Sequence, residues 1–366
     1  MQEGWAFFCG TTQNCGMGER WGSWMVCAAL TVAVAACSSD DGDTADSDDA
    51  DRATPAEVAP APSAGCGDAD AVTGEGKVTL QSGGVERWYL RHVPPAHDGS
   101  TPVPVVVDLH GYTEGADVHA VHSQLGPFGD EQGFMTLTPQ GAGVVPMWQA
   151  APGSDDVAFV GDMLDQVESD LCVDTARVFV TGLSNGAMMT SVLACDLADR
   201  FAAAAPVAGV TAVTDCDPAR PVPVVAFHGT EDPFLDYDGG FGPGVANLPT
   251  PDGEGTLGET PPPETDAVSV PDVLAAWADR NGCEAGEEPT RESIAEDVTL
   301  LASDCPEGAE VQLYRVEGGG HTWPGAEMLR GATDVVGLTT FSISANQVMW
   351  DFFAAHPLPT PPERSP

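Results

Sequence analysis

Short apolar runs alternate with segments of helical periodicity between residues 76 and 355. The run PVPVVVDLH, residues 102–110, is continuous and rich in β-branched residues, as is typical of a strand buried on both faces. After Ser154, a candidate helix N-cap, apolar residues recur at helical spacing from Val157 to Leu171. Strands are predicted at residues 76–81, 85–93, 102–110, 133–139, 177–181, 203–208, 222–228, 297–302 and 310–316, and further helices at residues 185–198, 271–281 and 345–355. This alternation predicts an α/β fold with a single, mostly parallel sheet flanked by helices on both faces.

Two stretches lack this alternation. Residues 239–266 are rich in Gly and Pro and show no periodicity, so we expect a long loop or lid there. Residues 357–366 are predicted to be a disordered tail, and the folded domain is expected to span residues 66–356.

The first 65 residues differ in composition from this domain. Residues 28–36 form an apolar run too short to span a bilayer, with Arg20 upstream and small residues leading into Cys37. We therefore predict a signal peptide over residues 1–37 that ends in a lipobox-like cysteine, with lipid on Cys37; an ordinary cleaved signal is the alternative. Residues 38–65 are acidic and then rich in Pro and Ala, which predicts a disordered tether. The protein is expected outside the cell or in the cell envelope. The lipid on Cys37 is the only contact with a membrane that we expect.

Charge and cysteine content narrow the classes of partner. The formal net charge of -43 at pH 7 would repel nucleic acids and anionic membranes, so neither is an expected partner. Six cysteines fall in the predicted domain: Cys66, Cys172, Cys195, Cys216, Cys283 and Cys305. An even number in an exported chain indicates disulfides, and we predict the local pair Cys283–Cys305 while the other pairings stay open. No Cys/His spacing typical of a metal site appears, so no metal is predicted.

The sequence Gly-Leu-Ser-Asn-Gly, residues 182–186, joins a predicted strand to a predicted helix. The pattern G-x-S-x-G alone is weak evidence, but this strand–turn–helix context is the one in which it presents a nucleophilic serine. The turn lifts the Ser184 hydroxyl out of the sheet at the positive end of the helix, where developing negative charge is stabilised. Ser184 is therefore the candidate nucleophile, and a simple helix-capping serine is the alternative.

A serine nucleophile needs a base and an acid, which in this kind of fold follow it in the order Asp or Glu, then His. Asp232 follows the strand at 222–228, and His321 follows the strand at 310–316, so all three groups meet at the carboxyl edge of a parallel sheet. Rival acids are Glu231, Asp236 and Asp238; Asp232 is preferred because Gly229 and Pro233 place it in a tight turn. Rival bases are His110 and His228; both end strands just before a glycine and are interpreted as structural.

Acyl transfer also requires N–H donors for the oxyanion. The Asn185 N–H directly follows the candidate nucleophile, and Tyr112 lies in the loop after an early strand, where the second donor is expected. Trp148, Tyr237 and Trp323 are candidate walls of a substrate-binding pocket, and the alternative for each is simple packing beneath a loop.

Six segments carry these motifs: LHGYTEGA, GFMTLTPQG, DLCVDTARVFVTGLSNGAMM, FAAAAPVAG, VVAFHGTEDPFLDYDGG and VEGGGHTWPG. Together they resemble the polyhydroxybutyrate depolymerase-like esterases, relatives of feruloyl and acetylxylan esterases in the α/β-hydrolase superfamily. The resemblance implies an α/β-hydrolase fold, a catalytic triad of Ser184, Asp232 and His321, secretion, and hydrolysis of carboxylic esters without a cofactor. The expected function is thus a serine carboxylesterase acting on hydroxyalkanoate oligomers or polyester. Feruloyl or acetylxylan esters are the alternative substrates; a peptidase and a catalytically idle surface binding protein are the alternative classes.

Overall fold

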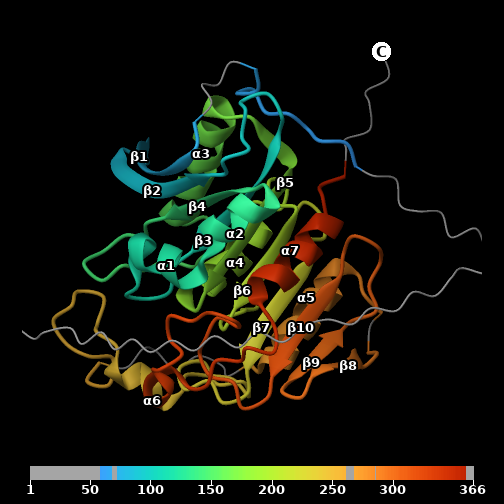
Figure 1. Ribbon diagram of the computed structural model, residues 1–366. Coiled ribbons are helices and arrows are strands. Elements are labelled where there is room, and N and C mark those ends of the chain that lie inside the picture. Colours follow the sequence, from blue (N-terminus) through green and yellow to red (C-terminus); the bar gives the residue numbers. More distant parts are fainter. Residues whose placement is uncertain (1–57, 68–71, 261–267, 285, 360–366) are drawn as a thin grey trace, which may run out of the picture. The chain divides into compact units, whose positions relative to one another are not determined.

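The computed structural model describes residues 58–67, 72–260, 268–284 and 286–359. Within these ranges ten strands form one sheet in the order β1-β2-β4-β3-β5-β6-β7-β10-β9-β8 (Figure 1). The strands are β1 Gly74–Ser82, β2 Val85–Val93, β3 Val103–Leu109, β4 Met135–Pro139, β5 Val173–Leu183, β6 Ala203–Val207, β7 Val224–Gly229, β8 Thr290–Ala295, β9 Val298–Ala302 and β10 Val311–Val316. The helices are α1 Gly115–Ser123, α2 Leu125–Gln132, α3 Asp155–Asp170, α4 Asn185–Asp196, the 3-10 helix η1 Pro243–Asn247, α5 Val270–Asn281, α6 Thr333–Val336 and α7 Ala345–Ala355.

The centre of the sheet is parallel and its two edges are antiparallel. Strands β4, β3, β5, β6, β7 and β10 pair in parallel with their neighbours. The β1–β2 hairpin adds to β4 at one edge, and β9 and β8 add to β10 at the other; the two edges lie on opposite sides in Figure 1. The predicted fold class, one mostly parallel sheet flanked by helices, is confirmed.

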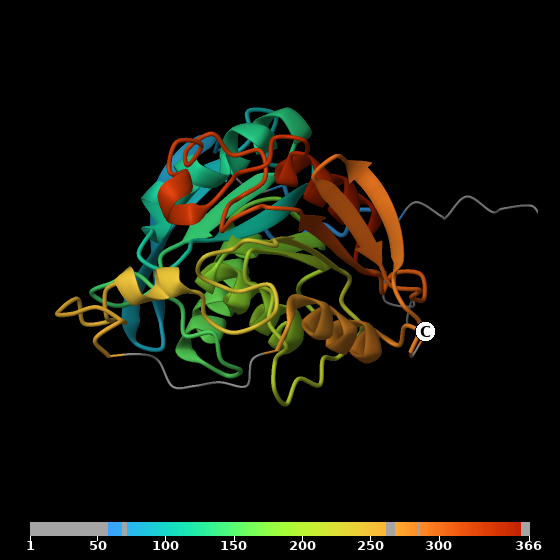
Figure 2. The same ribbon diagram turned by 90° about the horizontal axis from the view of Figure 1, so that it is seen from below.

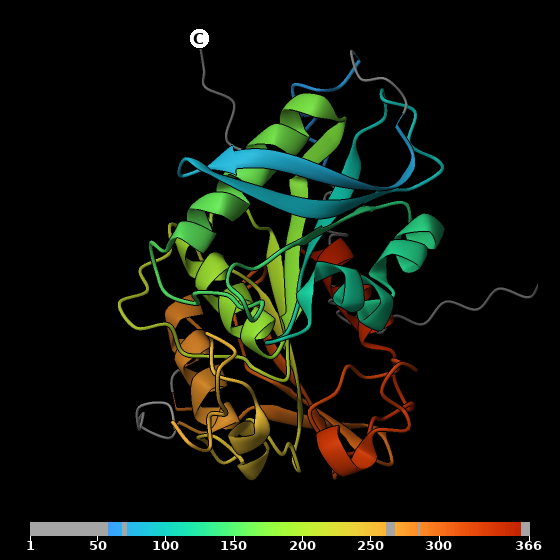
Figure 3. The same ribbon diagram turned by 90° about the vertical axis from the view of Figure 1, so that its left-hand side faces the viewer.

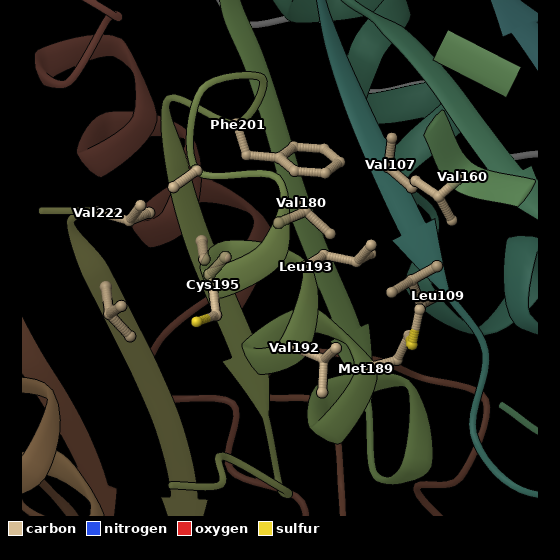
Figure 4. Close-up of a cluster of buried hydrophobic side chains, with 14 of the residues drawn as sticks. Val107, Leu109, Val160, Val180, Met189, Val192, Leu193, Cys195, Phe201 and Val222 are labelled. Carbon is tan, nitrogen blue, oxygen red and sulfur yellow. The ribbon is translucent and has the colours of Figure 1, made fainter. Parts of the chain in front are cut away.

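Each face of the sheet has its own hydrophobic core, because successive strand side chains point to opposite faces. In β3, Val105 and Val107 join the core beneath α3, α4 and α5, whereas Val106 joins the core beneath α2 and α7. Figure 4 shows part of the first core, where Met189 and Leu193 of α4 pack against the face of the sheet formed by β3 and β5. The central strands are therefore buried on both sides, which explains why they read as continuous apolar runs.

Most predicted elements are confirmed to within a few residues. The hydroxyl of Ser154 accepts a hydrogen bond from the Val157 N–H and so caps α3 as predicted. The sequence did not reveal α1 and α2, the edge strand β8, or the short helices η1 and α6.

Three disulfides join the cysteines of the described domain: Cys66–Cys172, Cys195–Cys216 and Cys283–Cys305. The last is the predicted pair, and the first two resolve the connectivity that the sequence left open.

The predicted boundaries of the domain require correction at both ends. Residues 58–65, predicted as part of the tether, lie along the start of β5, because Asp174 accepts from the Ala61 N–H at 2.8 Å and Arg177 donates to the Val58 carbonyl at 2.7 Å. At the other end, the Leu358 N–H donates to the Ala176 carbonyl at 2.7 Å. The signal peptide, Cys37 and residues 38–57 lie outside the described residues, as do residues 360–366. Across the described part of the chain, no helix combines the length and apolar character required for a transmembrane span.

The loops that follow β7 and β10 lie at the carboxyl end of the parallel strands. Figures 1 and 3 both show the segments around η1 and α6 beyond this end of the sheet, and Figure 2 views the molecule from there. Residues 239–266 were predicted to be a loop; their described part, up to residue 260, contains η1 and otherwise has no helix or strand. The candidate functional site lies beneath the segments around η1 and α6.

Candidate active site

Ser184 occupies a strained turn between β5 and α4. Its backbone has φ 59° and ψ -118°, a combination that L-residues rarely adopt. The two flanking glycines permit this turn: a Cβ at Gly182 would lie 2.7 Å from Leu109 Cβ, and one at Gly186 would lie 2.2 Å from the Leu109 carbonyl oxygen. The turn can therefore pack against the end of β3 only because positions 182 and 186 lack side chains.

Asp232 and His321 meet across the loops that follow β7 and β10. These strands pair in parallel, so the two loops begin side by side. His321 Nδ1 lies 2.7 Å from Asp232 Oδ2, and the N–H groups of Phe234 and Leu235 donate to Asp232 Oδ1 at 2.8 and 2.9 Å. Among the described residues, Glu231, Asp236 and Asp238 make no such contact with His321.

The environment keeps Asp232 ionised. Burial opposes the charged form, but the electrostatic attraction and hydrogen bond of the His321 imidazole and the N–H donors of the loop outweigh it and lower the pKa of Asp232. Its side chain is fully buried, and that of His321 is 10% exposed. A carboxylate at this position fixes the orientation of the imidazole, with Nδ1 as the donor.

Ser184, Asn185, Tyr112 and His321 line one cavity of about 420 Å³. Its remaining walls are largely apolar and come from the loop after β7, including Phe234, Phe241, Val245, Leu248 and Leu257. Leu329 and Val336, from the loop after β10, close another side. The structure thus brings the candidate nucleophile, base and oxyanion donors to a single apolar cavity.

The loop after β3 leaves one backbone donor free. The N–H groups of Gly111, Thr113 and Glu114 donate to Glu114 Oε2, the Pro146 carbonyl and the Gly111 carbonyl, respectively. Among the described residues, the Tyr112 N–H has no partner, and neither does the Asn185 N–H at the first position of α4. These are the two donors that the sequence selects for an oxyanion.

The three aromatic residues predicted to wall the pocket are not among the residues that line this cavity. Trp148 is 1% exposed and instead positions Asn185, because its backbone N–H and carbonyl bond the Asn185 side chain at 2.7 and 3.2 Å. Trp323 is also buried and donates to Asn346 Oδ1, and Tyr237 lies beside a separate cavity between α5 and β10. The alternative interpretation, packing beneath a loop, fits Trp148 and Trp323.

The rival histidines have structural partners, as predicted. His110 Nδ1 lies 2.8 Å from the Gly111 carbonyl, its Nε2 accepts from the Gly141 N–H at 2.9 Å, and burial lowers its pKa to about 4. His228 Nε2 lies 2.9 Å from the Leu235 carbonyl. Burial likewise lowers the pKa of His228. Both imidazoles are therefore neutral, and their hydrogen bonds hold the loops around the site in place.

Sequence reasoning missed two groups of residues at the cavity. The apolar side chains between Phe234 and Leu257 follow no helical or strand period, so no pattern marked them. Glu114 and His122, which also line the cavity, belong to a cluster with His119 that offers potential metal ligands within 4.8 Å of one another. The helical spacing of the two histidines in EGADVHAVH was the available signal.

The fold and this site define a serine hydrolase of the α/β-hydrolase class. The model of the Prolyl oligopeptidase family matches residues 148–234. The "Putative esterase NocK" of Nocardia uniformis subsp. tsuyamanensis is 30% identical over 318 residues, which are 82% of this chain and 86% of that protein. The chain belongs to the same family as this esterase.

Other relatives are similar over shorter stretches. "Feruloyl esterase B" of Piromyces equi is 29% identical over 246 residues, 64% of this chain, and the match spans 42% of that longer protein. Among solved structures, an acetyl xylan esterase from Aspergillus awamori aligns with a TM-score of 0.49 and 16% identity, covering 68% of this chain and 94% of that one.

Proposed function

We propose that the protein is a serine carboxylesterase in which Ser184 is the nucleophile, His321 the general base and Asp232 the group that orients it. Because His321 Nδ1 donates to Asp232, its Nε2 keeps the lone pair that a base requires. Nε2 accepts the Ser184 proton while Oγ bonds to the ester carbonyl carbon. The carbonyl oxygen becomes an oxyanion, and the Tyr112 and Asn185 N–H groups stabilise it, each by roughly 3 kcal/mol.

The tetrahedral intermediate then collapses. Its bond to the alcohol oxygen breaks, and the alcohol leaves with the proton that His321 carried. Water attacks the acyl-enzyme while His321 again accepts a proton, and the acid and free Ser184 are released.

The preferred substrates in this proposal are esters of a bulky, apolar acid of the feruloyl type. The observation that carries it is the largely apolar wall around Ser184 and His321, in a cavity of about 420 Å³. Pockets that bury a whole small organic ligand span about 300–1,000 Å³, and an acetyl group would leave most of this one empty. The names of the relatives also support feruloyl or acetylxylan esters over the hydroxybutyrate esters expected first from the sequence.

A substrate panel tests the acyl preference. Purified protein is assayed on methyl ferulate, methyl acetate and methyl 3-hydroxybutyrate, which share one leaving group. The proposal expects the highest kcat/KM on methyl ferulate and no turnover of any ester by Ser184→Ala. A higher kcat/KM on the hydroxybutyrate ester would contradict the feruloyl preference while leaving the esterase mechanism intact.

Phe241 offers a direct test of the apolar wall. Its side chain lines the cavity and is 49% exposed, so Phe241→Ala removes wall contact at little cost in stability. Losing about 1.5 kcal/mol of apolar contact lowers kcat/KM for methyl ferulate about tenfold, with a smaller effect on methyl acetate. Phe341→Ala is the matched control, because Phe341 is 39% exposed and does not line this cavity. Equal losses on both esters would contradict the role of the wall.

The partial match to the Prolyl oligopeptidase family makes a peptidase the second candidate. Comparing the methyl ester and the methylamide of ferulic acid separates the two functions, because they share the acyl group and differ in the bond cleaved. The proposal expects turnover of the ester alone.

We also propose that the protein works outside the cytoplasm. Three disulfides in the described domain indicate an oxidising compartment. Secretion by the segment at residues 1–37, and lipid on Cys37, remain part of this proposal, and the intact mass of the protein purified from its native membranes tests both. A mature chain that begins at Cys37 and carries acyl chains supports the anchor.

A further inference from the structure

A buried chain of polar side chains lies behind the loop that carries Tyr112. His119 Nε2 lies 2.7 Å from Asp108 Oδ1, and its Nδ1 lies 3.0 Å from Glu114 Oε2. Asp108 and His119 are fully buried, and the Glu114 side chain is 15% exposed. Two more donors complete the cluster: the Ser123 hydroxyl bonds Asp108 Oδ2 at 2.6 Å, and His122 Nδ1 bonds Glu114 Oε1 at 2.6 Å.

The cluster has a defined charge state. A carboxylate only accepts hydrogen bonds, so an imidazole with both nitrogens facing carboxylates carries a proton on each. Burial disfavours this imidazolium, but the charge of Asp108 and the hydrogen bonds to Asp108 and Glu114 outweigh burial and raise the pKa of His119 to about 10. His119 is thus a buried cation clamped between two anions. Such a geometry is rigid, because displacing one partner leaves an unpaired charge in the interior.

The distances favour this hydrogen-bonded cluster over a metal site. One atom each of Glu114, His119 and His122 would qualify as ligands. However, two ligands that share a zinc ion at about 2.1 Å stand more than about 3 Å apart. The 2.6 Å between His122 Nδ1 and Glu114 Oε1 is the length of a direct hydrogen bond between them.

Glu114 connects this cluster to the active site. Its Oε2, the oxygen that His119 holds, also accepts the Gly111 N–H at 3.1 Å. Gly111 directly precedes Tyr112, and its carbonyl shares a peptide unit with the free Tyr112 N–H. Glu114 holds Gly111 on both sides, because its carboxylate accepts the Gly111 N–H and its backbone N–H donates to the Gly111 carbonyl at 3.2 Å; His110 Nδ1 lies 2.8 Å from the same carbonyl. The loop is fixed on its other side by the Thr113 N–H on the Pro146 carbonyl at 2.9 Å and by the Tyr112 hydroxyl on the Pro249 carbonyl at 2.9 Å.

We propose that Glu114, held in place by His119 and Asp108, is a positioning residue for the oxyanion donor of Tyr112. Its side chain lies at the wall of the cavity, but in this role it acts through the Gly111 N–H and touches neither the nucleophile nor the reacting carbonyl. The proposal rests on the proposed esterase function, in which the Tyr112 N–H stabilises the transition state. Glu114 accordingly contributes to turnover rather than to substrate affinity.

The test is Glu114→Gln, assayed on a chromogenic ester. The amide retains the shape of the carboxylate, but its NH₂ group is a donor where the carboxylate oxygen was an acceptor. It therefore faces a donor of Gly111, His119 or His122 with no acceptor between them, and we expect the loop to shift. Misplacement of a catalytic group by about 1 Å costs about 100-fold in rate, and we expect kcat and kcat/KM to fall together by 10- to 100-fold. KM stays within about twofold of the wild-type value, and affinity for a boronic acid transition-state analogue falls by the same factor as kcat.

Two further variants keep this test decisive. If Glu114→Gln does not fold, Glu114→Asp replaces it: the charge that pairs His119 remains, but the shorter side chain no longer reaches the Gly111 N–H, and the same loss of kcat is expected. Asp130→Asn is the matched control, because it breaks an exposed histidine–carboxylate pair with His92 and should leave kcat unchanged.

A folded Glu114 variant with kcat and analogue affinity within twofold of wild type overturns the positioning role. So does a loss that appears in KM alone. Ser184→Ala, measured in parallel, separates this failure from a failure of the proposed function: turnover by Ser184→Ala would overturn the esterase mechanism itself, whatever Glu114 does.

Discussion

Gly186 offers the sharpest test of how closely the nucleophile turn packs against the oxyanion loop. A Cβ built on Gly186 lies 2.2 Å from the Leu109 carbonyl oxygen and 2.7 Å from the His110 carbonyl oxygen. Real Cβ contacts stay beyond 3.0 Å, so in Gly186→Ala the start of α4 must move away from the end of β3 by about 0.8 Å. Both contacts are with backbone atoms, so no side-chain rotation relieves them.

This displacement changes catalysis and stability together. The start of α4 carries Ser184 and the Asn185 N–H, whereas β3 leads to the Tyr112 N–H, so the shift separates the two proposed oxyanion donors. A misplacement near 1 Å costs about 100-fold in rate. Overpacking of a close-packed interior costs about 1–3 kcal/mol of unfolding free energy. The assays are kcat on a chromogenic ester and urea unfolding of the same preparation.

Gly161→Ala is the control. Gly161 lies inside α3, and a Cβ there has no atom within 4 Å. Alanine should therefore raise the unfolding free energy by about 0.5–1 kcal/mol and leave kcat unchanged. If Gly186→Ala keeps wild-type kcat and stability, the close approach of α4 to β3 is not a requirement of this site, and the reasoning from the glycine spacing is wrong.

Three other predictions concern the base, a disulfide and the buried cluster. Asp232→Asn should fold but lose about 10⁴-fold in kcat, because the amide no longer holds His321 in the required tautomer; a tenfold loss or less, measured on the same ester, would contradict this. Replacing Cys66 and Cys172, which are 106 residues apart, by Ser should lower the unfolding free energy by about 4–5 kcal/mol, as checked by urea denaturation. The raised pKa of His119 means that its contribution to stability is complete below about pH 6.5 and is lost as the pH rises through about 10. The urea concentration at the unfolding midpoint should therefore fall as the pH rises from about 6.5 to about 10, and it should fall less in His119→Gln. An equal decrease in both proteins would contradict the assignment.

The sequence was sufficient for the fold class and for the placement of the three candidate catalytic groups. Each of Ser184, Asp232 and His321 follows a strand of the parallel region, and the carboxyl ends of parallel strands share one edge of the sheet. Chain order and strand pattern therefore placed these groups near one another without knowledge of the loops between them.

The walls of the cavity were beyond this kind of reasoning. Phe241, Val245 and Leu248 lie in a segment held by its own turns and short bridges, so no period relates a position to the side it faces. Trp148 and Trp323 looked suitable for a substrate pocket because they are large and aromatic. Their indole N–H groups instead satisfy the His110 carbonyl and Asn346, partners that only the folded chain brings close.

The helices α1 and α2 were missed for a related reason. Helix α2 itself contains Gly126, Pro127 and Gly129, which weaken the helical signal of this part of the chain. In the structure these glycines are contact points: a Cβ at Gly126 would lie 3.1 Å from the His92 ring, and one at Gly129 would lie 2.7 Å from the Phe134 carbonyl oxygen. Tertiary packing, rather than local propensity, accounts for their placement.

Whether Ser184 is an activated nucleophile is tested by locating the residue that a fluorophosphonate probe modifies. The probe is attacked by an activated serine and remains covalently attached, so peptide mass spectrometry identifies the site. We expect a single adduct on Ser184, which is lost in Ser184→Ala and forms much more slowly in Asp232→Asn. An unmodified Ser184, or equal labelling of wild type and Ser184→Ala, would contradict this expectation.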